Sequence, residues 1–311
     1  MERLPDHVKG LLITGGGILV LTPDSLLVRL ISADAWTLLW WREVLMAVGL
    51  AVGLLAVYRG KTVAAFRAVG RSGCFIAFTF ACSSISFILA LTYTSVANTL
   101  VIVSAAPLFS AIFARVFLAE TVPRRTWGAI LLSLVGIALL VSDSLGQPSL
   151  LGDGCALLTA LFMAITLTIT RHARAVSMIP AIAMSGIVAA LAVWPLAQPA
   201  SVPESDLAVL GIMGLVMLPI AFGAITLGPR YLPAPEVSLL FLMETVLGPL
   251  WVWLVLSEDP GPRALLGGAI VVATLAGHSA LGFRRSSPHN LRARSRSVSE
   301  DALQERDDDV V

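Results

Sequence analysis

Apolar residues fill this chain in long runs, and short polar or charged stretches separate one run from the next. A helix needs about 20 apolar residues to cross the roughly 30 Å hydrocarbon core of a bilayer. Runs of this length recur along most of the chain, which predicts an all-α integral membrane protein. Breaking the sequence at charges and at Pro/Gly clusters predicts ten transmembrane helices. They cover residues 10–31, 36–58, 72–93, 96–118, 124–142, 150–171, 178–197, 207–228, 235–256 and 263–283.

Composition leads to the same class. Of the 311 residues 57% are hydrophobic and 13% are charged, and the mean hydropathy is +0.88. Soluble domains carry about 25% charged residues. The net charge of +1 gives no reason to expect a nucleic-acid partner. The three cysteines and four histidines have no metal-binding spacing, and the glycine-rich ITGGGILV lacks a following Gly-Lys-Ser/Thr, so we expect no metal and no cofactor.

Charges in the connections predict the orientation. With a cytoplasmic N-terminus, the short inner connections collect most of the basic residues, as the positive-inside rule requires. Both termini are then cytoplasmic. The inner set includes Arg59, Lys61, Arg124, Arg125, Arg171, Arg174 and Arg230, and the acids Asp34, Asp143, Asp153, Glu204, Asp206, Glu258 and Asp259 lie outside.

An internal repeat divides the chain into two halves. A shift of 138 residues lays 97–125 over 235–263 and brings Glu120 onto Glu258 and Arg125 onto Arg263. Each half holds five spans, an odd number, so the second half enters the membrane from the opposite side. We therefore expect two inverted repeats. The expected divisions are a cytoplasmic N-terminus 1–9, repeat 1 at 10–142, repeat 2 at 150–283 and a disordered charged cytoplasmic tail at 284–311.

Three stretches resemble the drug/metabolite transporter superfamily in its ten-helix EamA-type branch. They are ANTLVIVSAAPLFSAIFARVFLAE, WWREVLMAVGLA and LPAPEVSLLFLMETVLGPLWVWLVLSED. One departure is Thr245, because the family often has proline directly after the glutamate of the ninth span. The resemblance implies a transporter of small organic solutes, commonly an exporter of metabolites or amino acids, with two repeats around a central cavity. We expect it in the bacterial cytoplasmic (inner) membrane.

Four charged residues are expected inside the spans: Asp24, Arg42, Glu43 and Glu244. A charge at the centre of a transmembrane helix costs roughly 2.5 to 3.5 kcal/mol on the insertion scale, so such residues face protein or water and have partners. Arg42 and Glu43 point about a quarter turn apart, and we expect them not to pair with each other. Arg42 then needs another carboxylate, either from the protein or from the solute.

Glu244 lies about nine residues into its span, or roughly 13 Å along the helix, near the membrane midplane. Its helical face carries Trp251, an aromatic neighbour for a solute. Three roles compete: a structural ion pair, a ligand for a substrate amine, and a proton carrier. The family pattern, which keeps a glutamate here across many substrates, favours the structural role.

Aromatic and hydroxyl side chains supply further candidates. Trp36, Trp40 and Glu43 share one helical face, where two indoles suit a flat or cationic solute. An interfacial aromatic belt explains the tryptophans equally well; we favour it for Trp36 and leave Trp40 open. A hydroxyl stripe in the third span can line a polar path or bond to its own backbone. The stripe is Thr79, Ser83, Ser86 and Tyr93, and Asn98 and Pro107 of the fourth span can shape the same cavity.

These features predict a secondary transporter that works by alternating access, and not an enzyme. The expected partners are a small-molecule solute and membrane lipid, and a homodimer is left open. The alternatives are a membrane-embedded enzyme, for which no catalytic set is visible, and a receptor or scaffold, which needs no inverted repeat with buried charges.

Overall fold

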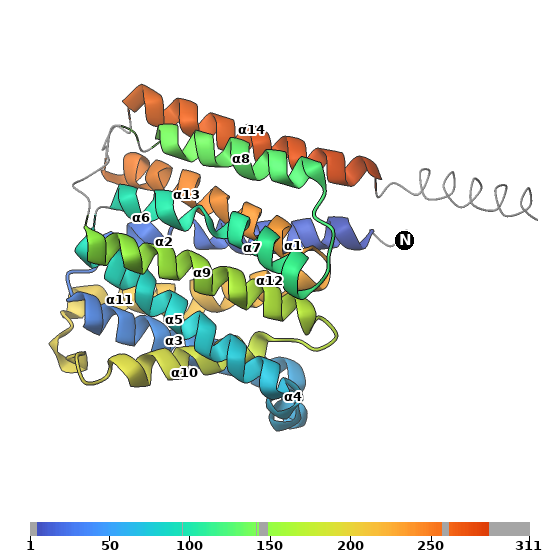
Figure 1. Ribbon diagram of the computed structural model, residues 1–311. Coiled ribbons are helices and arrows are strands. Elements are labelled where there is room, and N and C mark those ends of the chain that lie inside the picture. Colours follow the sequence, from blue (N-terminus) through green and yellow to red (C-terminus); the bar gives the residue numbers. More distant parts are fainter. Residues whose placement is uncertain (1–4, 95, 141, 143–148, 257–260, 286–311) are drawn as a thin grey trace, which may run out of the picture.

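The computed structural model describes residues 5–94, 96–140, 142, 149–256 and 261–285 (Figure 1). Within these ranges the chain forms helices and their connections, with no β-strand. The expectations for Asp143, Glu258, Asp259 and residues 286–311 of the tail lie outside the described residues. The α-helices are α1 (Asp6–Leu21), α2 (Asp24–Leu30), α3 (Ala35–Tyr58), α4 (Thr62–Ala68), α5 (Gly70–Tyr93), α6 (Val96–Val103), α7 (Ala106–Phe117), α8 (Arg124–Leu140), α9 (Leu150–His172), α10 (Ile179–Val193), α11 (Glu204–Gly211), α12 (Leu218–Leu227), α13 (Ala234–Leu256) and α14 (Gly261–Arg285). Short helices of other types are η1 (Arg59–Lys61), η2 (Pro199–Ser201), the π-helix η3 (Ile212–Met217) and η4 (Gly228–Arg230).

Eight helical segments of the described chain are long and apolar enough to cross a membrane. They cover eight of the ten expected spans, so the described residues are helical and supply the long apolar helices that a membrane protein needs. The remaining two expected spans, 124–142 and 178–197, contain α8 and α10. These helices have 17 and 15 residues and are shorter than the length that marks the other eight.

The first expected span is broken at Pro23, which the sequence analysis did not predict. Helix α1 ends at Leu21 and α2 begins at Asp24. Proline has no N–H to donate and its ring crowds the preceding turn, so a continuous helix cannot pass this point unperturbed. The hydroxyl of Thr22 donates to the carbonyl of Leu19 at 2.8 Å and accepts from Trp251 Nε1 at 2.9 Å. The break therefore lies against α13, and it leaves Asp24 buried at the start of α2.

The fourth expected span is also broken, into α6 and α7. The chain turns at Ser104 and Ala105, just before Pro107, which occupies the first turn of α7. The amide of Leu108 donates to the carbonyl of Ala105 instead of continuing the ladder from α6. Irregular backbone at membrane depth is tolerated where it is buried in protein or lines a wet cavity. By contrast α13, with Thr245 in place of proline, is a continuous helix.

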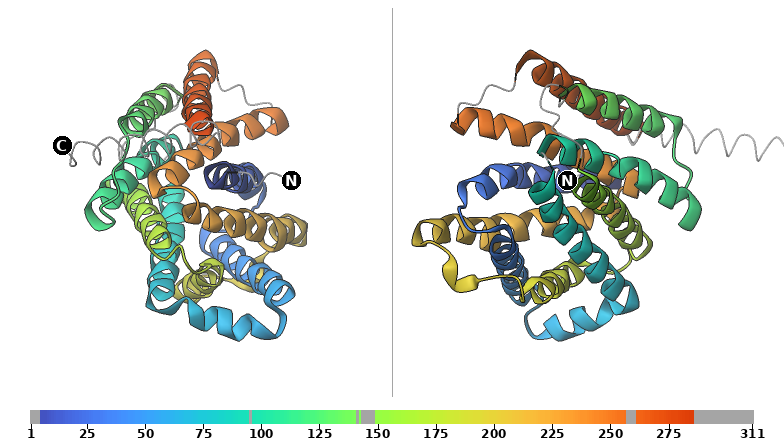
Figure 2. Two further views of the ribbon diagram at one scale, coloured as in Figure 1. Left: turned by 90° about the vertical axis from the view of Figure 1, so that its right-hand side faces the viewer. Right: turned by 60° about the vertical axis from the view of Figure 1, so that its left-hand side comes forward.

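Helix packing follows a two-fold pattern between the halves. The first and eighth expected spans pack together (α1 with α12), as do the third and sixth (α5 with α9), and exchanging the halves converts one pair into the other. The second packs on the seventh (α3 with α10), the fourth on the ninth (α7 with α13) and the fifth on the tenth (α8 with α14). Figure 1 shows α8 and α14 as a pair along one edge of the bundle, and Figure 2 shows the bundle from two further sides.

Corresponding spans run in opposite directions. His7, near the start of α1, and Arg125, at the start of α8, both contact Glu236 at the start of α13, and His278, late in α14, contacts it too. The same carboxylate thus meets the start of the first and fifth spans but the later part of the tenth. This is the arrangement that an inverted repeat requires.

Polar contacts fix connections at both ends of the bundle. Arg171 and Glu120 pair at one end of the bundle. At the other end the side chain of Asp34 accepts from the amides of Trp36 and Thr37 and caps α3. Its slight burial raises the pKa of Asp34, but these hydrogen bonds outweigh it and hold the pKa below its ordinary value. How these two ends face the membrane remains a prediction.

Close backbone approach joins α8 to α14 and gives a testable contact. A Cβ added at Gly267 would lie against backbone atoms of Gly136 and Leu140, whereas one at Gly277 on the same helix would meet nothing within 4 Å. We expect Gly267→Ala to lower the free energy of unfolding by about 1 to 3 kcal/mol, because backbone cannot rotate out of the way. Gly277→Ala is the matched control and is expected to cause no loss. Thermal unfolding of both purified variants in detergent checks this, and equal stability would contradict the packing.

Candidate functional site

A buried charge cluster joins the break after α1 to α3 and α5. Arg42 Nη2 donates to Asp24 Oδ2 at 3.1 Å, and Arg42 Nη1 donates to Glu43 Oε1 at 2.9 Å and to Ser84 Oγ at 3.3 Å. The hydroxyl of Ser84 in turn donates to Glu43 Oε1 at 2.5 Å. Asp24, Arg42 and Glu43 are 3%, 5% and 0% exposed, so the cluster is buried within protein.

The expectation that Arg42 and Glu43 do not pair is wrong. Their Cα–Cβ directions differ on the helix, but the guanidinium ends a long side chain that bends towards the space between α3 and α5. Glu43 reaches the same space, and Ser84 on α5 holds both groups there. The second carboxylate that Arg42 was expected to need is Asp24.

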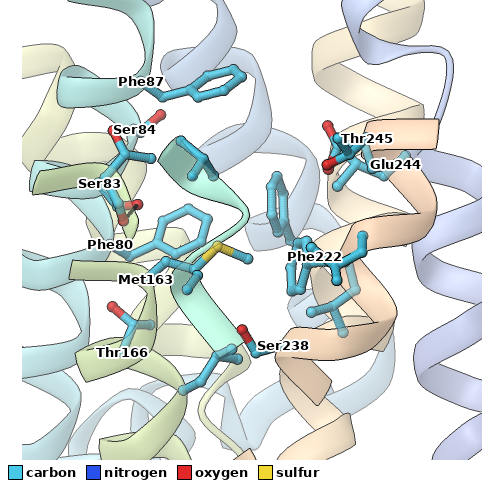
Figure 3. A pocket seen from close by; sticks show the side chains of 18 of the residues that line it. Phe80, Ser83, Ser84, Phe87, Met163, Thr166, Phe222, Ser238, Glu244 and Thr245 are labelled. Atoms are coloured by element: carbon cyan, nitrogen blue, oxygen red, sulfur yellow. Dashed lines mark hydrogen bonds between the residues drawn. The ribbon is translucent and has the colours of Figure 1, made fainter. Parts of the chain in front are cut away.

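Beside this cluster the bundle contains a cavity lined by both halves of the chain. Its empty volume is about 1120 Å³, counting the part open to solvent. Ser83 and Ser84 on α5 face Glu244 and Thr245 on α13 across it, with Phe80, Met163 and Phe222 between them (Figure 3). The broken helices contribute as well, because Leu21, Asp24, Val103, Ser104, Ala106 and Pro107 belong to the lining.

Glu244 lies on the α13 wall of this cavity and is partly exposed to it. Within the described part of the chain it makes no hydrogen bond, and no cation approaches it to within 4 Å. It is near enough to interact electrostatically with Asp24 and Arg42. This carboxylate is therefore the charged group of the lining that is open to a ligand.

The structure brings together some of the predicted residues and separates others. The predicted residues that line the cavity are Asp24, Arg42, Ser83 and Glu244. Glu43 lies behind them and accepts a hydrogen bond from Arg42. The predicted residues outside the lining form other contacts. Thr79 Oγ1 lies 2.7 Å from Thr166 Oγ1, Ser86 is buried, Asn98 Nδ2 donates to Thr94 Oγ1, Trp251 holds Thr22, Trp40 packs on Trp41 and Trp194, and Tyr93 is 48% exposed.

Sequence reasoning missed the α9 wall. Thr159, Met163, Thr166 and Thr170 all line the cavity and recur at steps of four, three and four. The hydroxyl-stripe test that selected Thr79 and Ser83 in the third span would have found the three threonines of this set in the sixth. Ser84 carried no such signal, because it lies one position off the stripe that includes Ser83.

A second cavity lies at the end of the bundle that holds Arg171. Glu120, Arg171 and Glu236 line it, together with prolines of the connections. Arg171 Nε donates to Glu120 Oε1 at 2.8 Å, and Arg171 Nη1 donates to the carbonyl of Pro229 at 3.0 Å. These contacts tie the connection after α7 to the second half of the chain.

The geometry defines a class of membrane protein: a helical bundle whose two inverted halves both line one cavity, mainly apolar with a few charged and hydroxyl groups. The chain matches the model of the EamA-like transporter family twice, over residues 25–142 and 150–279. It belongs to that family, within the drug/metabolite transporter superfamily whose resemblance the sequence showed.

Similarity to solved structures supports the fold. One chain, titled "Crystal structure of protein", superposes with a TM-score of 0.76 at 19% identity and covers 89% of this chain and 99% of its own length. At this identity the likeness concerns the fold alone. No curated protein matches the chain.

Proposed function

We propose that this protein is a secondary transporter that exports a small organic solute by alternating access between its two repeats. The observation that carries the proposal is the cavity between the halves, lined by charged and hydroxyl groups of both. Membrane transporters built from inverted repeats hold their solute at such a midplane site, beside broken helices. The breaks at Pro23 and before Pro107 fit this role.

The family supports transport, and the resemblance supports export. Proposed with it are cytoplasmic termini, location in the bacterial cytoplasmic membrane, repeats spanning 10–142 and 150–283, and a charged tail from residue 284. Rocking of the repeats requires contacts at one end to open while those at the other close. The pair Glu120–Arg171 is a contact of that kind, because it joins the halves at one end only.

Counterflow in liposomes tests the function. Purified protein is reconstituted, the liposomes are loaded with one unlabelled solute at a time, and uptake of the same labelled solute is followed. The panel contains organic amines, amino acids, organic anions and nucleosides. We expect counterflow of at least one solute that protein-free liposomes do not show.

A cavity-filling variant makes the test specific. Met163→Trp adds volume inside the cavity, and we expect it to abolish counterflow. Leu158→Trp adds the same indole on an outward face of α9, where Leu158 is 44% exposed, and should keep it. If no solute shows counterflow and one solute of the panel is chemically converted, the protein is an enzyme and the transport proposal is wrong.

A further inference from the structure

Among the described residues that line the cavity, Arg42 is the one basic side chain, and its terminal nitrogens already have partners. Arg42 gives both terminal nitrogens to Asp24, Glu43 and Ser84, and its remaining donor, Nε, is buried without a partner. A solute carboxylate or phosphate that reached the free Nε would also lie beside the carboxylates of Asp24 and Glu43, which already share the charge of this guanidinium. The described lining therefore offers no free cation to an anionic solute.

Among the described residues, carboxyl groups outnumber basic groups around the cavity. Asp24, Glu43 and Glu244 face one guanidinium, that of Arg42. Asp24 Oδ1 and Glu43 Oε2 are buried with no hydrogen-bond partner in the described structure, and Asp24 lines the cavity. Uncompensated charge is costly where water is scarce, so this site favours the arrival of a positive charge.

The rest of the lining suits an apolar body. Phe80 and Phe222 form an edge-to-face pair with ring centroids 5.0 Å apart, and Phe87, Phe241 and Met163 also line the cavity. An aromatic wall also attracts organic cations through the ring faces. A hydrated inorganic cation would gain little from it, and the described residues hold no group of three metal-ligating side chains.

We propose that the cavity binds an organic amine in its protonated form, with Glu244 as the counter-ion and the phenylalanine wall around the apolar part. The inference rests on the proposed transport function, because it names the charge class of the cargo in the same cavity. Glu244 Oε atoms accept from the ammonium, and the hydroxyls of Ser83 and Thr245 lie within the same lining.

Four probes that share a phenyl ring on a short alkyl chain and differ in the charge of the head group test the proposal without any variant. Binding of 2-phenylethylamine, 3-phenylpropionate, L-phenylalanine and 3-phenylpropanol to the purified full chain is measured by calorimetry. We expect the amine to bind about tenfold or more tightly than the other three, the effect of one charge-assisted hydrogen bond. Equal or tighter binding of the anion or the zwitterion would overturn the proposal, as would no binding of the amine at its highest soluble concentration.

Variants then assign the counter-ion. Glu244→Gln is expected to weaken binding of the amine about tenfold or more and to leave the neutral alcohol unaffected. Glu244→Asp should retain part of the preference, and the exposed acid Glu204, changed to Gln, is the matched control. An unchanged amine affinity in folded Glu244→Gln would remove Glu244 from the site.

Counterflow separates this inference from the transport function. If the amine binds but no solute shows counterflow, the amine site is supported and the transport function is rejected. If an anion or a nucleoside shows counterflow and amines are not preferred, the transport function is supported and the amine site is rejected.

Discussion

Arg42→Met is expected to lower the free energy of unfolding by about 3 to 5 kcal/mol, the cost of removing one partner from a buried ion pair. Methionine fills much of the space of the arginine stem but leaves Asp24 and Glu43 buried without their shared cation. Neither carboxylate can turn to water, because both are nearly fully buried. The measurement is unfolding of the purified variant in detergent, with folded yield as a second readout.

The matched control separates loss of charge from loss of the network. Arg115 lies exposed on α7, and Arg115→Met should leave stability nearly unchanged. The triple variant Asp24→Asn, Arg42→Met, Glu43→Gln should be more stable than Arg42→Met alone, since it removes the charges that were left uncompensated. A single variant as stable as the wild-type chain, or a triple variant no better than the single, would contradict this account.

Sequence alone predicted which charges lie inside the apolar spans but not how they are joined. Asp24, Arg42, Glu43 and Glu244 could be found because a charge inside an apolar run is costly in a membrane. Their partners depend on the reach of long side chains and on how α3 meets α5, which no spacing rule contains. The pairing of Arg42 with Glu43 is the example: the helical angle between adjacent positions argued against it, and Ser84 on another helix makes it possible.

The spans show a similar division. Long apolar runs predicted the helices well, because length and hydropathy are read directly from the chain. The break at Pro23 escaped, since proline is tolerated inside many membrane helices and only packing decides whether the helix stops. The sequence analysis expected Pro107 to shape the cavity but kept 96–118 as one span, and the structure shows that the helix is broken just before this proline.

Glu236 lies in the first turn of α13, and its replacement is the second change with a large expected effect. One carboxylate contacts His7 Nε2 at 2.8 Å, Arg125 Nη2 at 3.6 Å and His278 Nε2 at 3.7 Å, so it joins α1, α8 and α14 to α13. Its side chain is 5% exposed. Arg125 Nη1 and Nε and His7 Nδ1 are already buried without partners, so the removal of Glu236 takes away the compensation that remains.

We expect Glu236→Gln to lower the free energy of unfolding by about 2 to 4 kcal/mol, less than the full range for a buried pair because His7 and Arg125 keep about a fifth of their side chains in solvent. Glu204→Gln is the control, since Glu204 is also in the first turn of a helix and shares the favourable dipole position, but is exposed. A double-mutant cycle with Arg125→Met measures the coupling between the two side chains.

Binding of 2-phenylethylamine to Glu236→Gln should stay unchanged, because Glu236 lines the second cavity and not the cavity that contains Glu244. A stable Glu236→Gln with zero coupling to Arg125 would mean that the helices at this end are held by apolar packing alone.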